Sequence, residues 1–480
     1  YIIYGKKNKS FTKLKDDGSF ILEEEGFPSK TIDNDKVFDM NYLKSFLNLS
    51  FEIKKEFEYY YPLDSRHSGR DLIPNHLSFF IFNHAILFPQ NLWPRQIVVN
   101  GSVLMDGKKM SKSMGNIIPL RKAIQQYGAD SIRVAMLVLG ELLQDVDFSF
   151  SILKGIYTKL KEIYNFYISF YKNNKSIIES LLNIFNSSEE KLLLENENLN
   201  MEDKWLLTRL NHNISTITFS FEKLKIREAL NTALYMMDKD FEWYKRRKFS
   251  KYGHLYQTKK DVFIIYTFLT KRIKVLSPFC PFLSEELWHL FGNNNSIFTN
   301  TWPSIDKNQI QDSLNEENEQ YISNILNDLN KIIKITKNTS INKVFLYLSS
   351  EEKNYLYWEI LRLFVNNQNK NKNFGEIMKT LLSESNQDDK IKNIIKKNTV
   401  FIKKTIDDIL SLSPAERERR YNIGKFDEFK PLLDSITLLS DELKIPAENF
   451  YIYGENQKEI MDPNKKARFS RPFKPAIFLE

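Results

Sequence analysis

The sequence lacks three features that would place it in a specialised class. It has one cysteine, Cys280, among 480 residues, which excludes a disulfide scaffold and a zinc site built on cysteines. Its longest apolar runs, such as Ala135–Gly140 and Val262–Tyr266, are far shorter than the roughly 20 residues that a membrane-spanning helix needs. No basic start followed by an apolar stretch marks a secretory signal. We therefore predict a soluble, cytoplasmic protein with no membrane partner.

The excess of positive over negative charge in the sequence is also small. The chain has 69 Lys and Arg against 61 Asp and Glu, a formal net charge of +8 at pH 7, which creates no strong field if it is spread evenly. The basic residues are clustered, however: Lys245–Lys248 reads KRRK and Lys465–Lys474 reads KKARFSRPFK. Hydrophobic residues make up 42% of the chain, which is enough for several packed cores and excludes a disordered or fibrous protein.

The first part of the chain predicts an α/β region. The stretch before about residue 63 is polar and irregular, and it begins without methionine, so we expect a piece of a longer protein. Asp71–Leu87 is apolar nearly all round, the pattern of a buried helix, and Asp71 suits its N-cap. Ile97–Val99 and Val103–Met105 read as short strands, with a turn at Asp106-Gly107 and a helix further on. Strands and helices in this order favour an α/β domain.

Beyond about residue 149 the pattern changes to helices. Apolar residues recur at helical spacing over Ile152–Phe170, Leu206–Ile217 and Ile264–Leu276, which predicts an α-helical bundle. The last region mixes helices with a strand that the sequence predicts at Val344–Leu348. The predicted regions are α/β in residues 1–148, α-helical in 149–306 and α+β in 307–480.

The most informative segment is Gly107–Asn116, GKKMSKSMGN, between a predicted strand and a predicted helix. Its lysine ammonium groups, serine hydroxyls and backbone N–H groups can bind a phosphate chain, and its glycines let the backbone approach closely. The spacing is not that of a P-loop. Without further context, such a run is more often a solvated basic loop.

Three ordered segments resemble the class I aminoacyl-tRNA synthetases. KMSKS at residues 109–113 is that family's signature, Tyr127–Arg133 (YGADSIR) resembles its G-A-D-x-x-R segment, and Ser68–His76 (SGRDLIPNH) resembles its G-x-D adenosine-binding element. Tyr59–His76, YYYPLDSRHSGRDLIPNH, is similar to the leucyl enzymes of the archaeal and eukaryotic cytosolic kind. The resemblance implies a leucine–tRNA ligase that forms leucyl-adenylate and transfers the leucyl group to tRNA.

The resemblance also implies the architecture. Residues 1–148 would be a Rossmann-type catalytic remnant, the helical region an anticodon-binding domain and the last region a tRNA-binding domain. No H-x-G-H motif occurs and no editing domain is recognisable, so we expect this chain alone to be inactive. Ser102 stands where many eukaryotic leucyl enzymes have histidine.

The partners implied are ATP carried with Mg²⁺, leucine and tRNA(Leu), and we expect a monomer with no metal site of its own. Lys112, assisted by Lys109, would stabilise the charge that develops on the phosphates. Asp71 would accept hydrogen bonds from the ribose, although a plain helix cap is the alternative. His76 is a weaker assignment, because a histidine on an apolar helix is more often a core residue. The expected ATP contacts are Gly69, Asp71, His76, Met110, Ser111, Lys112 and Ser113.

The basic clusters are the candidates for tRNA phosphates, although a charge run is usually a solvated face. Trp205 and Trp288, in contrast, are expected to pack in the core of the bundle. The expected phosphate contacts are Lys245, Arg246, Arg247, Lys248, Lys465, Lys466, Arg468 and Arg471.

Two competing functions remain open from the sequence, while a third, a generic nucleotide-binding scaffold, leaves the helical and C-terminal resemblance unexplained. One is a related class I enzyme for valine, isoleucine or methionine, against which the segment after Asp71 argues. The other is a non-catalytic RNA-binding protein derived from a synthetase, which the missing H-x-G-H motif favours. Amino-acid-dependent activation of ATP would separate them.

Overall fold

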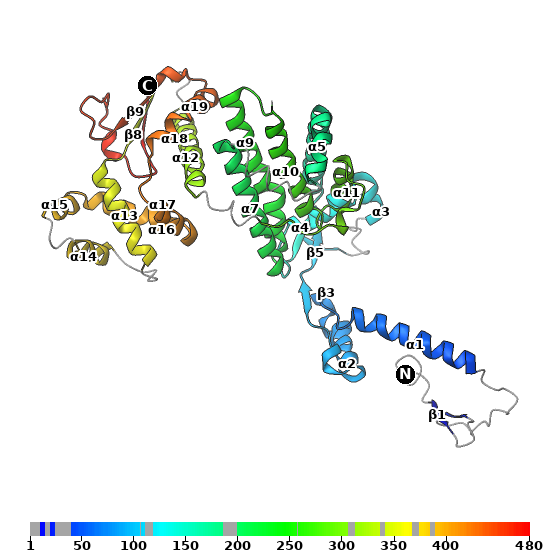
Figure 1. Cartoon of the computed structure of the whole chain (residues 1–480). Coiled ribbons are helices and arrows are strands. Elements are labelled where there is room, and N and C mark those ends of the chain that lie inside the picture. The colour runs from blue at the N-terminus through cyan, green and yellow to red at the C-terminus, as the bar shows by residue number, and fades with distance from the viewer. Residues whose placement is uncertain are drawn as a thin grey trace. The chain divides into compact units, whose positions relative to one another are not determined.

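The computed structural model describes residues 10–14, 20–24, 40–105, 107–110, 119–185, 199–256, 258–305, 313–336, 341–366, 374–384 and 389–480 (Figure 1). The chain forms two compact units, Tyr1–Ser102 and Val103–Glu480. Among the described helices, none combines the length and the apolarity that a bilayer span requires.

The first unit contains a long helix and a pair of parallel strands. α1 (Met40–Tyr60) has no glycine or proline, so nothing in the segment interrupts helical hydrogen bonding. β3 (Arg66–Gly69) pairs in parallel with β4 (Ile97–Asn100). An antiparallel pair, β1 (Ser10–Leu14) and β2 (Phe20–Glu24), precedes α1. For the described residues of this stretch the prediction of irregular structure is wrong, because a polar sequence without helix breakers can still form a helix.

The apolar segment after Asp71 is helical but not buried. Short helical turns at Arg70–Leu72 and Ile73–Leu77 lead into α2 (Ser78–Leu87). The side chains of Phe79 and Ile86 in α2 are 68% and 70% exposed. A helix that is apolar on every side is suited to burial, but it is buried only where other segments pack against it. The prediction of a buried helix is wrong for the described residues of this unit.

The second unit begins with a small mixed sheet of order β6-β5-β7. β5 (Val103–Met105) pairs antiparallel with β6 (Lys108–Lys109) and parallel with β7 (Val146–Phe148). Gly107 has a φ of +73°, which glycine adopts without strain, and it makes the predicted turn between β5 and β6. Both predicted strands are confirmed, although β4 and β5 belong to different sheets. Two helices connect β6 to β7, α3 (Leu120–Tyr127) and α4 (Ala129–Val138).

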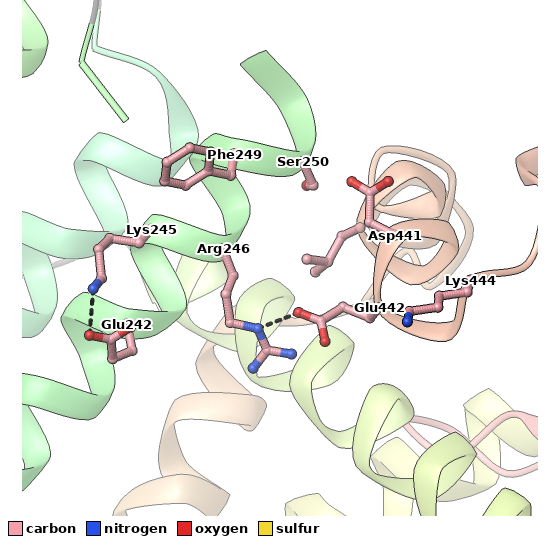
Figure 2. Close-up of a pocket in the computed structure, with 9 residues that line it drawn as sticks. Glu242, Lys245, Arg246, Phe249, Ser250, Asp441, Glu442 and Lys444 are labelled. Carbon is pink, nitrogen blue, oxygen red and sulfur yellow. Dashed lines mark hydrogen bonds and ion pairs between the residues drawn. The ribbon is translucent and has the colours of Figure 1, made fainter. Parts of the chain in front are cut away.

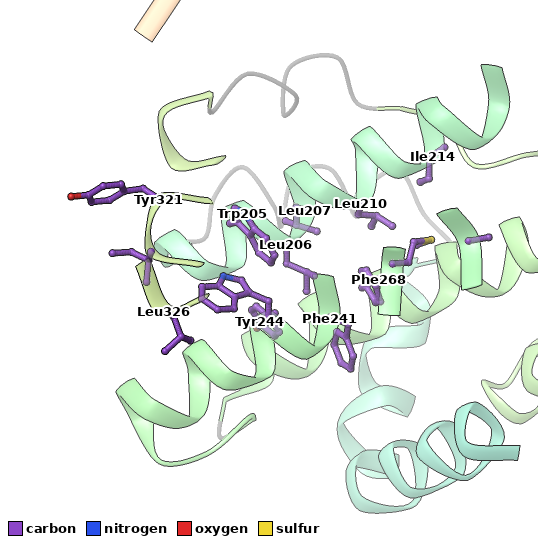
Figure 3. Close-up of a cluster of buried hydrophobic side chains, with 14 of the residues drawn as sticks. Trp205, Leu206, Leu207, Leu210, Ile214, Phe241, Tyr244, Phe268, Tyr321 and Leu326 are labelled. Carbon is purple, nitrogen blue, oxygen red and sulfur yellow. The ribbon is translucent and has the colours of Figure 1, made fainter. Parts of the chain in front are cut away.

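A helical bundle follows, as the spacing of apolar residues predicts. Leu210, Phe241 and Phe268 from three different helices lie in one hydrophobic core (Figure 3). Trp205 and Trp288 are only 7% and 4% exposed, so the expectation that both pack in the core is confirmed. The helices of this bundle are α5 (Phe150–Phe185), α7 (Met201–Glu222), α8 (Ile226–Asn231), α9 (Met237–Tyr252), α10 (Lys259–Leu276) and α11 (Pro281–Leu290).

The last region combines helices with a three-stranded sheet. Its central strand, β8 (Val344–Leu348), is antiparallel to β10 (Ala476–Leu479) and parallel to β9 (Phe450–Gly454). All five residues of β8 are buried, which explains why a continuous apolar run predicted this strand and not its two neighbours. The domain boundaries at residues 148 and 306 stay a prediction. The helices are α12 (Ser313–Thr336), α13 (Glu351–Asn366), α14 (Phe374–Glu384), α15 (Asp389–Lys397), α16 (Thr399–Ser411), α17 (Pro414–Ile423), α18 (Phe429–Leu433) and α19 (Ile436–Leu443).

Candidate nucleotide-binding and RNA-binding sites

The KMSKS segment begins at the end of a hairpin that is tied to the sheet. Gly107 donates its N–H to Oδ1 of Asp147 at 2.9 Å, which fastens the β5–β6 turn to β7. Met110 is half-buried and packs against the main hydrophobic core. The other predicted phosphate contacts of this segment have side chains outside the described residues and stay predictions: Lys109, Ser111, Lys112 and Ser113.

Gly69 and Asp71 lie at the carboxyl end of β3, the edge at which parallel sheets bind ligands. Gly69 has an extended backbone with φ −70° and ψ 146°, so its conformation does not require glycine. A Cβ at Gly69 would, however, lie 2.5 Å from Oδ1 of Asp71 and would displace that carboxylate. The helical turn here begins at Arg70, and its N-cap residue is Gly69, which has no side chain to cap it, so the alternative of Asp71 as an N-cap is wrong. The Asp71 side chain is exposed, as a ligand contact requires.

The two histidines of this unit differ in burial. His76, the weaker ATP candidate, is exposed, and its Nε2 lies 3.2 Å from Nη2 of Arg66. His84 is buried, with Nδ1 2.7 Å from the carbonyl oxygen of Phe80 and Nε2 3.4 Å from the hydroxyl of Tyr61. His84 is therefore a core residue with both ring nitrogens partnered.

The second half of the KRRK run is buried in the bundle. The Lys248 side chain is 3% exposed, and its Nζ lies 2.7 Å from Oδ1 of Asp261 and 3.1 Å from Oδ1 of Asp203. Tyr244 also donates its hydroxyl to Asp203, at 2.8 Å. Burial alone would lower the pKa of Lys248, but hydrogen bonds and charges from Asp261 and Asp203 outweigh it and raise the pKa. The prediction that Lys248 contacts a phosphate is wrong, because its ammonium is enclosed and already paired.

Arg247 is also part of the scaffold. Its Nε lies 3.0 Å from Oε2 of Glu319, and its Nη1 donates to Oγ of Ser435 at 2.9 Å. The same Glu319 carboxylate accepts the indole N–H of Trp243 at 2.8 Å. Burial raises the pKa of Glu319, and the charge of Arg247 offsets this only in part. The predicted phosphate contact of Arg247 is wrong for the same reason as that of Lys248.

The first half of the run lines an open groove of about 590 Å³ formed by α9 and α19 (Figure 2). Nζ of Lys245 lies 2.5 Å from Oε1 of Glu242, and Nε of Arg246 lies 2.5 Å from Oε1 of Glu442. The Arg246 guanidinium also lies 5.3 Å from the ring centroid of Trp243. Both cations are accessible, but a phosphate in this groove would have to displace a carboxylate.

The C-terminal basic segment is presented differently. Lys465, Lys466 and Arg468 are exposed, and no ion pair joins them to another described side chain. Asp462 holds the turn, because its carboxylate accepts the N–H of Lys466 at 2.6 Å and of the following residue at 2.8 Å. Arg471 is instead paired, with Nη1 2.6 Å from Oδ2 of Asp408.

Two residues that the sequence analysis did not select shape this segment. Lys353 is 7% exposed, and its Nζ donates to the carbonyl oxygens of Arg468 at 2.8 Å and Ser470 at 2.9 Å. Phe469 is 54% exposed, and its ring lies 4.7 Å from the Arg468 guanidinium. An aromatic residue among basic ones (KKARF) was the available signal, since aromatic rings stack on unpaired bases.

Two parts of the chain match known families. Residues 35–149 match the family described as tRNA synthetases class I (I, L, M and V). Residues 203–346 match the family described as the anticodon-binding domain of tRNA ligase. The KMSKS segment and α4 lie in the first match, and the KRRK run lies in the second.

Curated proteins similar to this chain include leucine–tRNA ligases of archaea. The one from Methanosarcina acetivorans is 33% identical over 429 residues, which are 89% of this chain and 40% of the relative. The one from Ignicoccus hospitalis is 38% identical over 302 residues, 63% of this chain and 28% of the relative. A solved complex of an Agrobacterium radiobacter LeuRS with tRNA and LeuAMS has a TM-score of 0.42 at 19% identity, covering 60% of this chain and 31% of that chain. The chain thus spans about two fifths, or less, of the length of these curated relatives.

Proposed function

We infer that this chain, a homologue of archaeal leucine–tRNA ligases, belongs to an enzyme that activates leucine with ATP and transfers it to tRNA(Leu). The observation that supports this most strongly is the KMSKS segment, which starts from the β5–β6 hairpin and ends before α3. The hairpin fixes the backbone at the start of the segment, at Lys108–Lys109.

In the proposed first step, a carboxylate oxygen of leucine attacks the α-phosphorus of ATP and the bond to the bridging oxygen of pyrophosphate breaks. Negative charge grows on the leaving pyrophosphate, and Lys112 with Lys109 would stabilise it. Backbone N–H groups and hydroxyls of Met110, Ser111 and Ser113 would hold the phosphates. In the second step, a hydroxyl of the terminal tRNA ribose attacks the leucyl carbonyl and AMP leaves.

The adenosine would be held by residues of the first unit. The Asp71 carboxylate would accept hydrogen bonds from the ribose hydroxyls, Gly69 would allow close approach, and His76 would lie near the nucleotide. Mg²⁺ would add charge neutralisation at the phosphates. The described residues contain no group of three His, Cys, Asp or Glu side chains that could hold a metal ion, so we propose that Mg²⁺ arrives with ATP.

We propose that tRNA phosphates contact the exposed cations Lys465, Lys466 and Arg468. Lys245, Arg246 and Arg471 are secondary candidates, because each is already paired with a carboxylate. We further propose that the gene product works as a monomer in the cytoplasm.

The test is ATP–pyrophosphate exchange by the full-length gene product, with leucine, valine, isoleucine and methionine assayed in parallel. Exchange with leucine alone is the expected result. Exchange with another of the four would reassign the amino acid. No exchange with any of them would leave an RNA-binding protein derived from a synthetase as the better explanation.

Lys112→Ala should slow single-turnover adenylate formation by roughly 10²–10³-fold, since the loss of one preorganised donor costs about 3–4 kcal/mol of transition-state stabilisation. Lys108→Ala, which removes an exposed lysine from the same segment, is the matched control. Circular dichroism should be unchanged in both variants. An unchanged single-turnover rate in Lys112→Ala would remove this lysine from the mechanism.

A further inference from the structure

The G-A-D-x-x-R segment forms the start of α4 and fastens that helix to α11. Asp130 is 8% exposed, and its carboxylate accepts the backbone N–H of Leu283 at 2.6 Å and of Phe282 at 3.4 Å. These N–H groups belong to the first turn of α11, where no intrahelical acceptor is available. Asp130 also lies in the first turn of α4, so two helix N-termini with favourable dipoles converge on one carboxylate.

Arg133, one helical turn further along α4, fastens the other side of the same corner. Its Nε donates to the carbonyl oxygen of Phe279 at 3.2 Å and its Nη2 to that of Pro278 at 2.9 Å. Both carbonyls lie between the end of α10 and the start of α11. Residues three apart lie on one face of a helix. Asp130 and Arg133 therefore bind the donors and the acceptors of a single corner, in which the Cys280 side chain is fully buried.

A third polar contact and the core complete the attachment of α4. The carboxylate of Glu141, just beyond α4, accepts the backbone N–H of Arg227 at 3.3 Å and of Glu228 at 3.1 Å, in the first turn of α8. Val134 and Ala135 on α4 have no exposed surface and share their hydrophobic core with β5 and β7. Packing of this density resists small displacements.

The position of α4 bears on the hairpin from which the KMSKS segment starts. The segment leaves β6, whose partner β5 is paired with β7 and packed in the same core as α4. It returns to α3, which leads into α4 through Gly128 at a φ of +77°. The hairpin and α3, which flank the segment in the chain, therefore both belong to the body that α4 holds against the bundle.

We propose that Asp130, together with Arg133, is a positioning residue, which fixes α4 against the α10–α11 corner and thereby holds in place the β5–β6 hairpin, from which the KMSKS segment starts. The expected effect of this contact on catalysis rests on the proposed function. Its expected effect on the stability of the hairpin does not. The burial that raises the pKa of the Asp130 carboxylate is a cost that its hydrogen bonds offset only in part.

The test compares wild type with Asp130→Asn in the full-length gene product. Asparagine keeps the shape but turns an N–H₂ group toward a backbone N–H. We expect faster deuterium uptake in residues 278–283 and in the hairpin, residues 103–110. In leucine-dependent pyrophosphate exchange we expect kcat to fall roughly tenfold to a hundredfold, the scale of a small misplacement of reacting groups. The KM for leucine should stay unchanged.

Glu285→Gln is the matched control. Glu285 also lies on α11, but its carboxylate accepts the N–H of Ile297 at 2.9 Å instead of joining α11 to α4. It should leave the hairpin and kcat unchanged. If Asp130→Asn loses its folded circular dichroism spectrum, Arg133→Lys provides the same test, because lysine cannot donate to both carbonyls in the same geometry.

Unchanged uptake in the hairpin of the folded variant overturns the proposal, whatever the kinetics show, and leaves Asp130 as a local cap of α11. Faster uptake in the hairpin, with a lower kcat, supports it. If the wild type exchanges pyrophosphate with no amino acid, the proposed function fails, and the hairpin uptake still decides whether Asp130 positions the hairpin.

Discussion

Two basic segments that look alike in the sequence differ in burial and in pairing in the structure. In KRRK, Arg247 and Lys248 are buried and paired with carboxylates. In the C-terminal segment, Lys465 and Lys466 are exposed on a turn whose backbone is held by a hydrogen bond to the Asp462 carboxylate. The comparison teaches that a cluster of positive charge is informative about RNA only after its position on the helix or turn is known.

The helical repeat explains why KRRK divides into halves. Phe241, Tyr244 and Lys248 fall at spacings of three and four, so they share the face of α9 that packs in the bundle. The acidic partners could also be anticipated in part, because Asp203 and Asp261 are each the third residue of a helix with a capping box. A lysine on a buried stripe, facing two such carboxylates, is a structural residue.

The largest loss of stability is expected when Lys248 is replaced. We expect Lys248→Met to reduce the free energy of unfolding by roughly 3–5 kcal/mol, because it removes the cation that the buried carboxylates of Asp203 and Asp261 share and leaves Asp203 only the more distant Lys260, at 4.0 Å. Lys245→Met, on the same helix but in a pair with the exposed Glu242, should cost about 1 kcal/mol or less. Urea denaturation measures both. A loss below 1 kcal/mol for Lys248→Met would mean that its partners are solvated.

A second experiment tests the support beneath the C-terminal segment, where the carboxylate of Glu428 is buried in addition to the ammonium of Lys353. Burial raises the pKa of Glu428 to about 7, and the charge of Asp427 adds to this rise. The N–H of Phe473, the hydroxyl of Tyr321 and the charge of Arg420 lower the pKa, but only in part. In the unfolded chain this carboxyl has a pKa near its ordinary value of 4.5. Folding therefore favours its protonated form.

The contribution of Glu428 to stability is largest below about pH 4.5 and is lost as the pH rises toward 7. We expect wild type to lose up to about 3 kcal/mol over this interval relative to Glu428→Gln. Urea titrations at several pH values, analysed as the difference between the two proteins, measure it. Parallel stability curves would show that Glu428 is ionised at no cost.

The smallest effect on stability is expected at the exposed turn. Replacing Lys465, Lys466 and Arg468 together by alanine should change the free energy of unfolding by less than about 0.5 kcal/mol. The slope of log affinity for tRNA against log salt should become shallower by roughly two to three, close to one per lost phosphate contact. Lys425→Ala removes an exposed lysine paired with Glu351 and should leave the slope unchanged. An unchanged slope in the triple variant would exclude these residues from the tRNA interface.

The sequence was most informative where a pattern is local. Helical spacing identified the bundle, the continuous apolar run identified β8, and KMSKS identified the segment after β6. It was least informative where long-range packing decides. The apolar pattern of α2 could not show that Phe79 is exposed, and the G-A-D-x-x-R letters could not show that Asp130 binds backbone groups about 150 positions further along the chain.

The buried corner between α10 and α11 also gives the protein a chemical reporter. Cys280 is the only thiol in the sequence, and its burial raises its pKa, so in the closed corner it is both shielded and un-ionised. Its rate of reaction with a thiol reagent under native conditions therefore measures how often this corner opens. No engineered label is needed, and the readout concerns the same contact that Asp130 and Arg133 hold closed.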